Sequence, residues 1–160
     1  MLQSTQLFIQ RRQEYTTNKL SLRDVTNIGG GKKNQCFLNA TSERDRKHGV
    51  ALASGWLVGP FDDSNGSFEV FAHFWNTTMT GYNFDTTPFP EINFEYVSDI
   101  SLMAFIMKND RKLFSFVPSS LCYKNNSFFL VDENTDGTLR SSVIEDLTTE
   151  TLFSRKFKTF

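Results

Sequence analysis

The chain has 160 residues, which suits one domain, residues 1–160, large enough to bury a core without metals or disulfides. Seventeen phenylalanines raise the aromatic content to 14%, and this supply of core residues excludes intrinsic disorder. The net charge is −1, and no apolar run approaches the roughly 18 residues of a membrane span. We therefore expect neither a nucleic-acid partner nor a membrane.

The chain begins without a charged region followed by an apolar one, so we expect no secretory signal. This favours a cytoplasmic location (the host cytoplasm, if the protein is viral) and free thiols at Cys36 and Cys122. Each cysteine is 12, 37, 49 or more residues from either histidine, His48 or His73, unlike zinc-ligand pairs. We expect no metal and no cofactor, and the sequence does not indicate an oligomeric state.

The first third of the chain predicts two helices joined through a glycine-rich loop. Residues 4–14 begin with Ser4, a capping residue, and read as a short helix. Three consecutive glycines in the loop over 27–33 allow backbone angles that are closed to other residues. Residues 36–47 read as a second helix whose basic C-terminal end suits the helix dipole, and Gly49 follows as a stop.

The rest of the chain reads mainly as antiparallel strands. An apolar strand over 50–58 is followed by a turn at 62–66, a strand over 67–77 and its hairpin partner over 81–86. Beyond these we expect a short helix near 98–107, strands over 113–117 and 127–131 with a hairpin around 124–126, and a closing helix over 141–157. Helices combined with a mostly antiparallel sheet make the class α+β.

The first hairpin predicts a contact between an imidazole and a carboxylate. A loop of residues 78–80 would pair Thr77 with Gly81, place Gly81 in the left-handed region, and set His73 directly opposite Asp85. Opposed residues have Cβ atoms roughly 4.5–5.5 Å apart, which lets a carboxylate hold an imidazole N–H. A one-residue slip would turn Asp85 to the other face, and Asp99 would then be the substitute carboxylate.

The third member is a thiol. Cys36 opens the second predicted helix, where unpaired N–H groups and the helix dipole favour a thiolate. The backbone N–H of Cys36 is the better candidate for an oxyanion hole, with the side chains of Gln35 and Asn34 as alternatives. Trp75 is a candidate wall or substrate contact. Cys36, His73 and Asp85 thus supply the parts of a Cys-His-Asp nucleophilic site.

These stretches resemble the transglutaminase-like, papain-like cysteine enzyme superfamily. The resemblance covers about residues 30–90 and is carried by His73-Phe74-Trp75 followed by the run from Gly81 to Thr87. Cys36-Phe37-Leu38-Asn39-Ala40 and Gly55-Trp56 also look like small bacterial and bacteriophage members. The resemblance implies a core in which the Cys-bearing helix packs on an antiparallel sheet. It also implies thiol-dependent hydrolysis or acyl transfer at an amide, peptide or isopeptide carbonyl, with a peptide, protein or small amide as substrate.

Blander interpretations remain open for each residue. Cys36 can be a small buried core residue, and His73 a satisfied core histidine. His48 at a helix end and Cys122, with no histidine after it, are best explained as structural. The glycine-rich loop invites a phosphate-loop interpretation but lacks that motif's frame. The alternative function is a non-catalytic binding or inhibitor protein, of the kind phages encode, that retains the fold.

Overall fold

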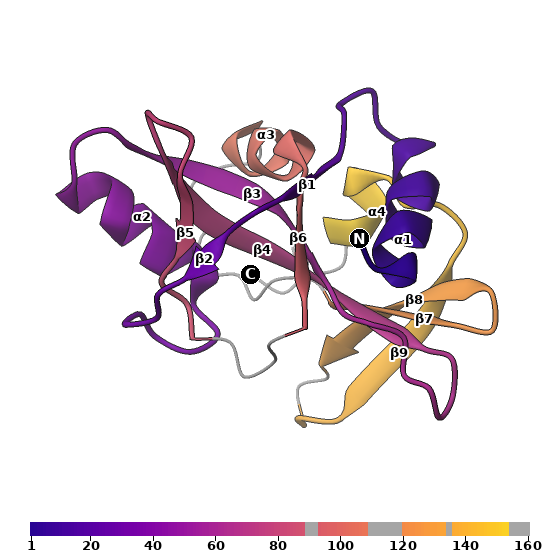
Figure 1. Cartoon of the computed structure of the whole chain (residues 1–160). Coiled ribbons are helices and arrows are strands. Elements are labelled where there is room, and N and C mark those ends of the chain that lie inside the picture. The colour runs from indigo at the N-terminus through magenta and orange to yellow at the C-terminus, as the bar shows by residue number, and fades with distance from the viewer. Residues whose placement is uncertain (89–92, 109–119, 134–135, 154–160) are drawn as a thin grey trace.

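The structure is a computed structural model that describes residues 1–88, 93–108, 120–133 and 136–153. Its helices are α1 (Gln3–Gln13), α2 (Cys36–Arg46), α3 (Ile100–Lys108) and α4 (Thr149–Phe153). Its strands are β1 (Ser21–Arg23), β2 (Thr26–Asn27), β3 (Val50–Val58), β4 (Phe68–Thr78), β5 (Asn83–Asp85), β6 (Glu95–Ser98), β7 (Ser120–Lys124), β8 (Ser127–Glu133) and β9 (Leu139–Ile144). The expected α+β class is confirmed (Figure 1). None of the described helices has the length and apolar character needed to cross a membrane.

All the strands join one sheet, and β4 lies near its middle. The main order is β1-β6-β3-β4-β7-β8-β9, with β5 beside β4 and β2 beside β5. The β2–β5 pair is parallel and the other pairs are antiparallel. One edge of β4 pairs with β3 over residues 70–78, whereas the other edge pairs with β7 over 68–71 and with β5 over 76–77. His73 therefore lies between the two strands that share this second edge.

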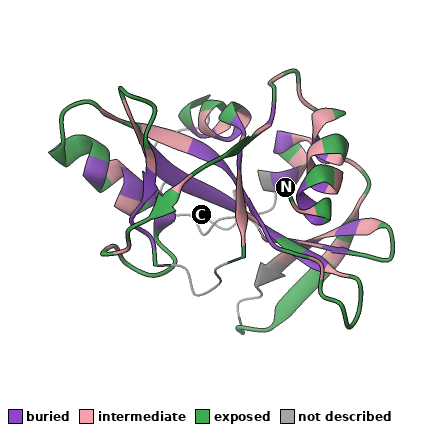
Figure 2. Ribbon diagram, in the orientation of Figure 1, coloured by how far each residue is buried: buried purple, intermediate pink, exposed green. Residues whose placement is uncertain are grey.

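Burial alternates along the first half of β4 and is continuous over residues 72–76, so the strand is mostly buried (Figure 2). Successive side chains of a strand point to opposite faces, and Phe68, Val70, Ala72 and Phe74 therefore share one face. Phe68, Val70 and Ala72 join a large cluster with residues of α1, β3, α3, β7, β8 and α4. Phe74, two residues further on, joins a smaller cluster with Cys36, Phe37, Ala40 and Ile106. A single strand thus contributes to both clusters, and the smaller one holds the start of α2 on the sheet.

A buried ion pair connects the N-terminal helix to the rest of the domain. Arg12 Nε donates to Asp99 Oδ2 at 3.0 Å, and neither side chain has measurable exposure. Arg12 also donates to Ser101, Thr149 and the carbonyl of Leu147. Trp56 Nε1 donates to the same Asp99 oxygen at 2.9 Å. This carboxylate therefore stabilises the core and takes no part in the His73 contact.

Several predicted elements occur close to their expected bounds. The helices over 4–14 and 36–47, the strands over 50–58 and 67–77, the short helix near 98–107 and the hairpin around 124–126 correspond to α1, α2, β3, β4, α3 and the β7–β8 turn. The strand predicted over 113–117 lies outside the described residues. The sequence did not predict β1, β2 or β6, whose positions depend on pairing with distant strands.

The closing helix over 141–157 is wrong. Residues Leu139–Ile144 form β9, which pairs with β8 along its whole length, and of the described part of this segment, residues 141–153, only Thr149–Phe153 are helical. Ser141, Ser142, Val143 and Ile144 are poor helix formers, and a neighbouring strand offers them backbone partners. Strand pairing therefore decides the conformation of this segment.

Candidate active site

Cys36 is the first residue of α2. The chain turns into the helix through Asn34, which has a left-handed φ of 59°, and Gln35, whose side chain makes no capping hydrogen bond. The first N–H groups of a helix have no intrahelical partner, and no acidic residue occupies the first turn of α2. Cys36 therefore lies at the helix end where the dipole and N–H groups without intrahelical partners favour negative charge.

Side chains of β4 fix the start of α2. Phe37 meets Phe74 edge to face, with ring centroids 5.0 Å apart. Asn76 Nδ2 donates to the carbonyl of Ala40 at 2.9 Å, so a buried amide of the strand is bonded to the first turns of the helix. Cys36 is only 3% exposed in this arrangement.

His73 and Asp85 are in direct contact, as predicted, but through a different register. The ladder pairs Thr77 with Asn83 and Asn76 with Phe84, because the turn from Thr78 to Tyr82 is two residues longer than expected. The predicted Thr77–Gly81 pairing is therefore wrong, and continuing the observed register sets Asp85 level with Trp75, diagonal to His73. A two-residue shift keeps every side chain on its face, so His73 Nε2 still lies 2.6 Å from Asp85 Oδ2. Gly81 adopts the expected left-handed conformation, with φ of 82°.

The Asp85 carboxylate accepts hydrogen bonds at both oxygens. The backbone N–H of Thr87 donates to Oδ1 at 2.8 Å. At Oδ2 the contact with His73 is joined by the Tyr96 hydroxyl at 2.9 Å and, at a longer 3.4 Å, by Asn27 Nδ2. These donors come from the segment after β5 and from β6 and β2, so the fold converges on this buried charge.

The contacts shift both pKa values toward the charged forms. Burial by itself would lower the pKa of His73, but hydrogen bonds to Asp85 and Cys36 and their negative charges raise it to about 9. Burial would raise the pKa of Asp85, and the hydrogen bond and charge of His73 hold it below its ordinary value instead. Burial and the Asp85 charge raise the pKa of Tyr96, so its hydroxyl stays a donor.

The arrangement forms a continuous chain from carboxylate to thiol. Because Asp85 is ionised and accepts only, His73 Nε2 must be the donor to it. The other ring nitrogen, Nδ1, is left for the hydrogen bond to Cys36 that raises the His73 pKa. A base fixed in one tautomer against a thiol is the arrangement that nucleophilic catalysis requires.

The three residues predicted to assist the site, Asn34, Gln35 and Trp75, differ in their exposure. Asn34 and Gln35 are exposed at the turn into α2. Trp75 is 1% exposed, and its ring packs edge to face on Tyr96 at 5.6 Å. The Trp75 Nε1 has no hydrogen-bond partner among the described residues. In this conformation Trp75 is a buried packing partner of the Tyr96 ring.

Sequence reasoning missed three partners of the carboxylate. Thr87 belongs to the Asp85-Thr86-Thr87 run, and an aspartate accepting from the N–H two residues later is a common local turn, so this partner could have been found. Tyr96 and Asn27 carry no local signal, because β6 and β2 reach Asp85 only through the sheet.

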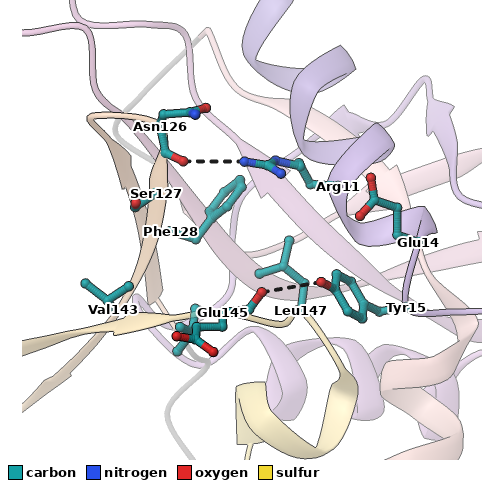
Figure 3. Close-up of a pocket in the computed structure, with 10 residues that line it drawn as sticks. Arg11, Glu14, Tyr15, Asn126, Ser127, Phe128, Val143, Glu145 and Leu147 are labelled. Carbon is teal, nitrogen blue, oxygen red and sulfur yellow. Dashed lines mark hydrogen bonds between the residues drawn. The ribbon is translucent and has the colours of Figure 1, made fainter.

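No other described region offers a comparable set of groups. A hollow of about 370 Å³ lies between α1, the β7–β8 turn and the segment after β9, with Arg11 donating to the Asn126 carbonyl and Tyr15 to the Glu145 carbonyl (Figure 3). Its described lining has neither a cysteine nor a histidine.

Cys122 is a free thiol like Cys36, but burial raises its pKa. Within the described ranges no group of histidine, cysteine and acidic residues is arranged to hold a metal ion.

Comparisons of the chain with protein-family models, with curated proteins and with solved structures find no match. The geometry of Cys36, His73 and Asp85 is therefore the basis on which a function can be proposed.

Proposed function

We propose that the protein is a thiol-dependent hydrolase or acyltransferase acting on an amide, peptide or isopeptide carbonyl. The observation that carries the proposal is the hydrogen-bonded series Cys36–His73–Asp85, with the thiol at a helix start and the carboxylate buried. The Cys-bearing helix on an antiparallel sheet also fits the transglutaminase-like, papain-like core that the sequence resembles.

Each residue then has a role. The Cys36 thiolate attacks the carbonyl carbon, and the backbone N–H of Cys36 at the start of α2 stabilises the developing oxyanion. The His73 imidazolium gives its Nδ1 proton to the leaving amine, which departs and leaves an acyl thioester on Cys36. His73 then takes a proton from water or an acceptor amine as that molecule attacks the thioester, and the thiolate is released. Asp85 holds the ring and stabilises its positive charge.

One observation favours the non-catalytic alternative. Cys36 and His73 are each 3% exposed and Asp85 is 1% exposed, so a substrate reaches the sulfur only through a narrow opening or after a local movement. A binding protein that keeps the fold has no need of such an opening. In that case Cys36, His73 and Asp85 serve only to hold α2 on the sheet.

Thiol alkylation separates the two functions. Iodoacetamide is small, and its rate of reaction reports the thiolate fraction of each cysteine when peptides are mapped by mass spectrometry. An active site predicts rapid labelling of Cys36 near neutral pH and a large loss in His73→Ala. A scaffold predicts slow labelling of Cys36 that is the same in both proteins, and this result would end the enzyme proposal.

A further inference from the structure

A groove of about 640 Å³ adjoins the candidate site. One wall is the loop of residues 28–32 and the other is the outer face of α2 from Gln35 to Arg46. Its lining residues include Gln35 and Thr86, which directly adjoin Cys36 and Asp85 in the chain. The groove, called the α2 groove from here on, therefore runs along the outer face of α2 from Gln35, the residue before the candidate nucleophile.

Hydrogen bonds hold the loop wall in place. Asn39 on α2 accepts from the backbone N–H of Lys32 at 2.9 Å and donates to the Lys32 carbonyl at 2.8 Å and to Thr87 Oγ1 at 3.1 Å. The Gly31 N–H donates to the Thr86 carbonyl at 2.8 Å. A Cβ on Gly31 would come within 2.6 Å of the Asn39 side chain, so a larger residue would have to displace Asn39 from these hydrogen bonds. The groove is thus preformed.

The α2 groove is positively charged. Lys32, Arg46 and Lys47 line it, and Glu43 is the only carboxylate among its lining residues. The charge of Lys47 is already paired within the protein, because its Nζ lies 2.7 Å from Glu43 and over the ring of Phe84. Arg46 also contacts Glu43, yet its side chain is 67% exposed and has further N–H donors. Three cations against one anion leave the groove able to accept negative charge.

Resting on the proposed function, we propose that the α2 groove binds an acidic peptide segment of the substrate, with a Glu or Asp carboxylate on Arg46. Ten helical residues separate Cys36 from Arg46, or about 15 Å at 1.5 Å per residue. An extended peptide covers this distance in about four to five residues. The acidic residue therefore lies about four residues from the reacting carbonyl. Arginine suits this role because its planar guanidinium pairs with a carboxylate through two hydrogen bonds.

Peptide binding to Cys36→Ala tests the inference without any chemical step. We would measure dissociation constants by fluorescence anisotropy. The peptides have ten residues, are otherwise neutral, and carry a pair of Glu residues at successive positions or a pair of Lys residues at the same positions. The expected result is about five- to tenfold tighter binding of the Glu peptides at 50 mM salt, lost in Arg46→Gln. Arg44→Gln removes the same charge from the other side of α2 and is the matched control, expected to change nothing.

Three results would overturn the inference: equal binding of Glu and Lys peptides, equal effects of the two arginine substitutions, or tighter binding of an oligothymidylate than of any Glu peptide. The outcomes separate it from the proposed function. If Cys36→Ala binds Glu peptides more tightly than Lys peptides but the unmodified protein shows no acyl chemistry, the groove inference is supported and the enzyme proposal is refuted. Acyl chemistry without discrimination refutes the groove alone.

Discussion

Replacing Asp85 with asparagine should make the Cys36 thiol much less reactive, because an amide has only one accepting oxygen where the carboxylate has two. If its oxygen takes the N–H of Thr87, its NH₂ group faces His73 Nε2 and the Tyr96 hydroxyl. The ring must then move its proton to Nδ1, where it can no longer act as a base toward Cys36. If the amide is flipped, two donors oppose each other at Thr87. Either orientation loses a buried hydrogen bond, at a cost of about 1–3 kcal/mol in the free energy of unfolding.

The loss of negative charge sets the size of the chemical effect. With Asp85 ionised, the pKa of His73 is about 9. Without Asp85, only the hydrogen bond and charge of Cys36 are left to oppose the effect of burial, so the pKa of His73 falls toward its ordinary value of 6.5. A fall all the way to that value corresponds to about 3 kcal/mol of stabilisation lost from the thiolate–imidazolium pair. We expect the alkylation rate of Cys36 near pH 7 to fall about 30- to 300-fold.

Cys122 provides an internal reference in the same assay. Burial and the Glu69 charge raise the pKa of its thiol, so it should react slowly and at the same rate in both proteins. The rates at Cys36 and Cys122 are measured by peptide mapping across pH 5 to 9. Cys36 rates that agree within about twofold between the unmodified protein and Asp85→Asn would refute the reasoning.

Three further predictions follow from the same contacts. Tyr96→Phe removes one donor from Asp85 while keeping the ring, so Cys36 alkylation should fall about three- to tenfold, and an unchanged rate would show that the hydroxyl is idle. His73 contributes stability that is fully present below pH 6.5 and is lost as the pH rises through about 9; urea titrations should show a fall of about 3 kcal/mol over this range that is absent in His73→Gln. Asp99→Asn leaves the buried Arg12 without its carboxylate, so the free energy of unfolding should drop by about 2–4 kcal/mol while the Cys36 rate is retained. A silent Asp99→Asn in urea would contradict the role given to this ion pair.

The sequence predicted the parts of the site that depend on local signals. Cys36 at the start of α2 followed from a helix that opens just after a glycine-rich loop, and the shared face of His73 and Asp85 followed from strand periodicity. The register was wrong by two residues, yet the contact survived because side chains repeat every two residues along a strand.

The remainder depends on long-range pairing and could not be predicted. Tyr96 reaches Asp85 because β6 lies beside β3, and Asn27 does so because β2 runs parallel to β5. Neither short strand carries a periodic pattern long enough to identify it. The same limit explains β9, whose partner β8 determines its conformation.

The most direct test of the central claim is to trap the acyl group on Cys36. The protein would be mixed with p-nitrophenyl acetate or peptide thioesters, quenched in acid within seconds, and analysed by intact mass and peptide mapping. The account predicts one acyl group, on Cys36, in the unmodified protein and in Cys122→Ala, none in Cys36→Ala, and slow acylation in His73→Ala. Two results would contradict this account: no acylation of the unmodified protein, or acylation of Cys36→Ala as rapid as that of the unmodified protein.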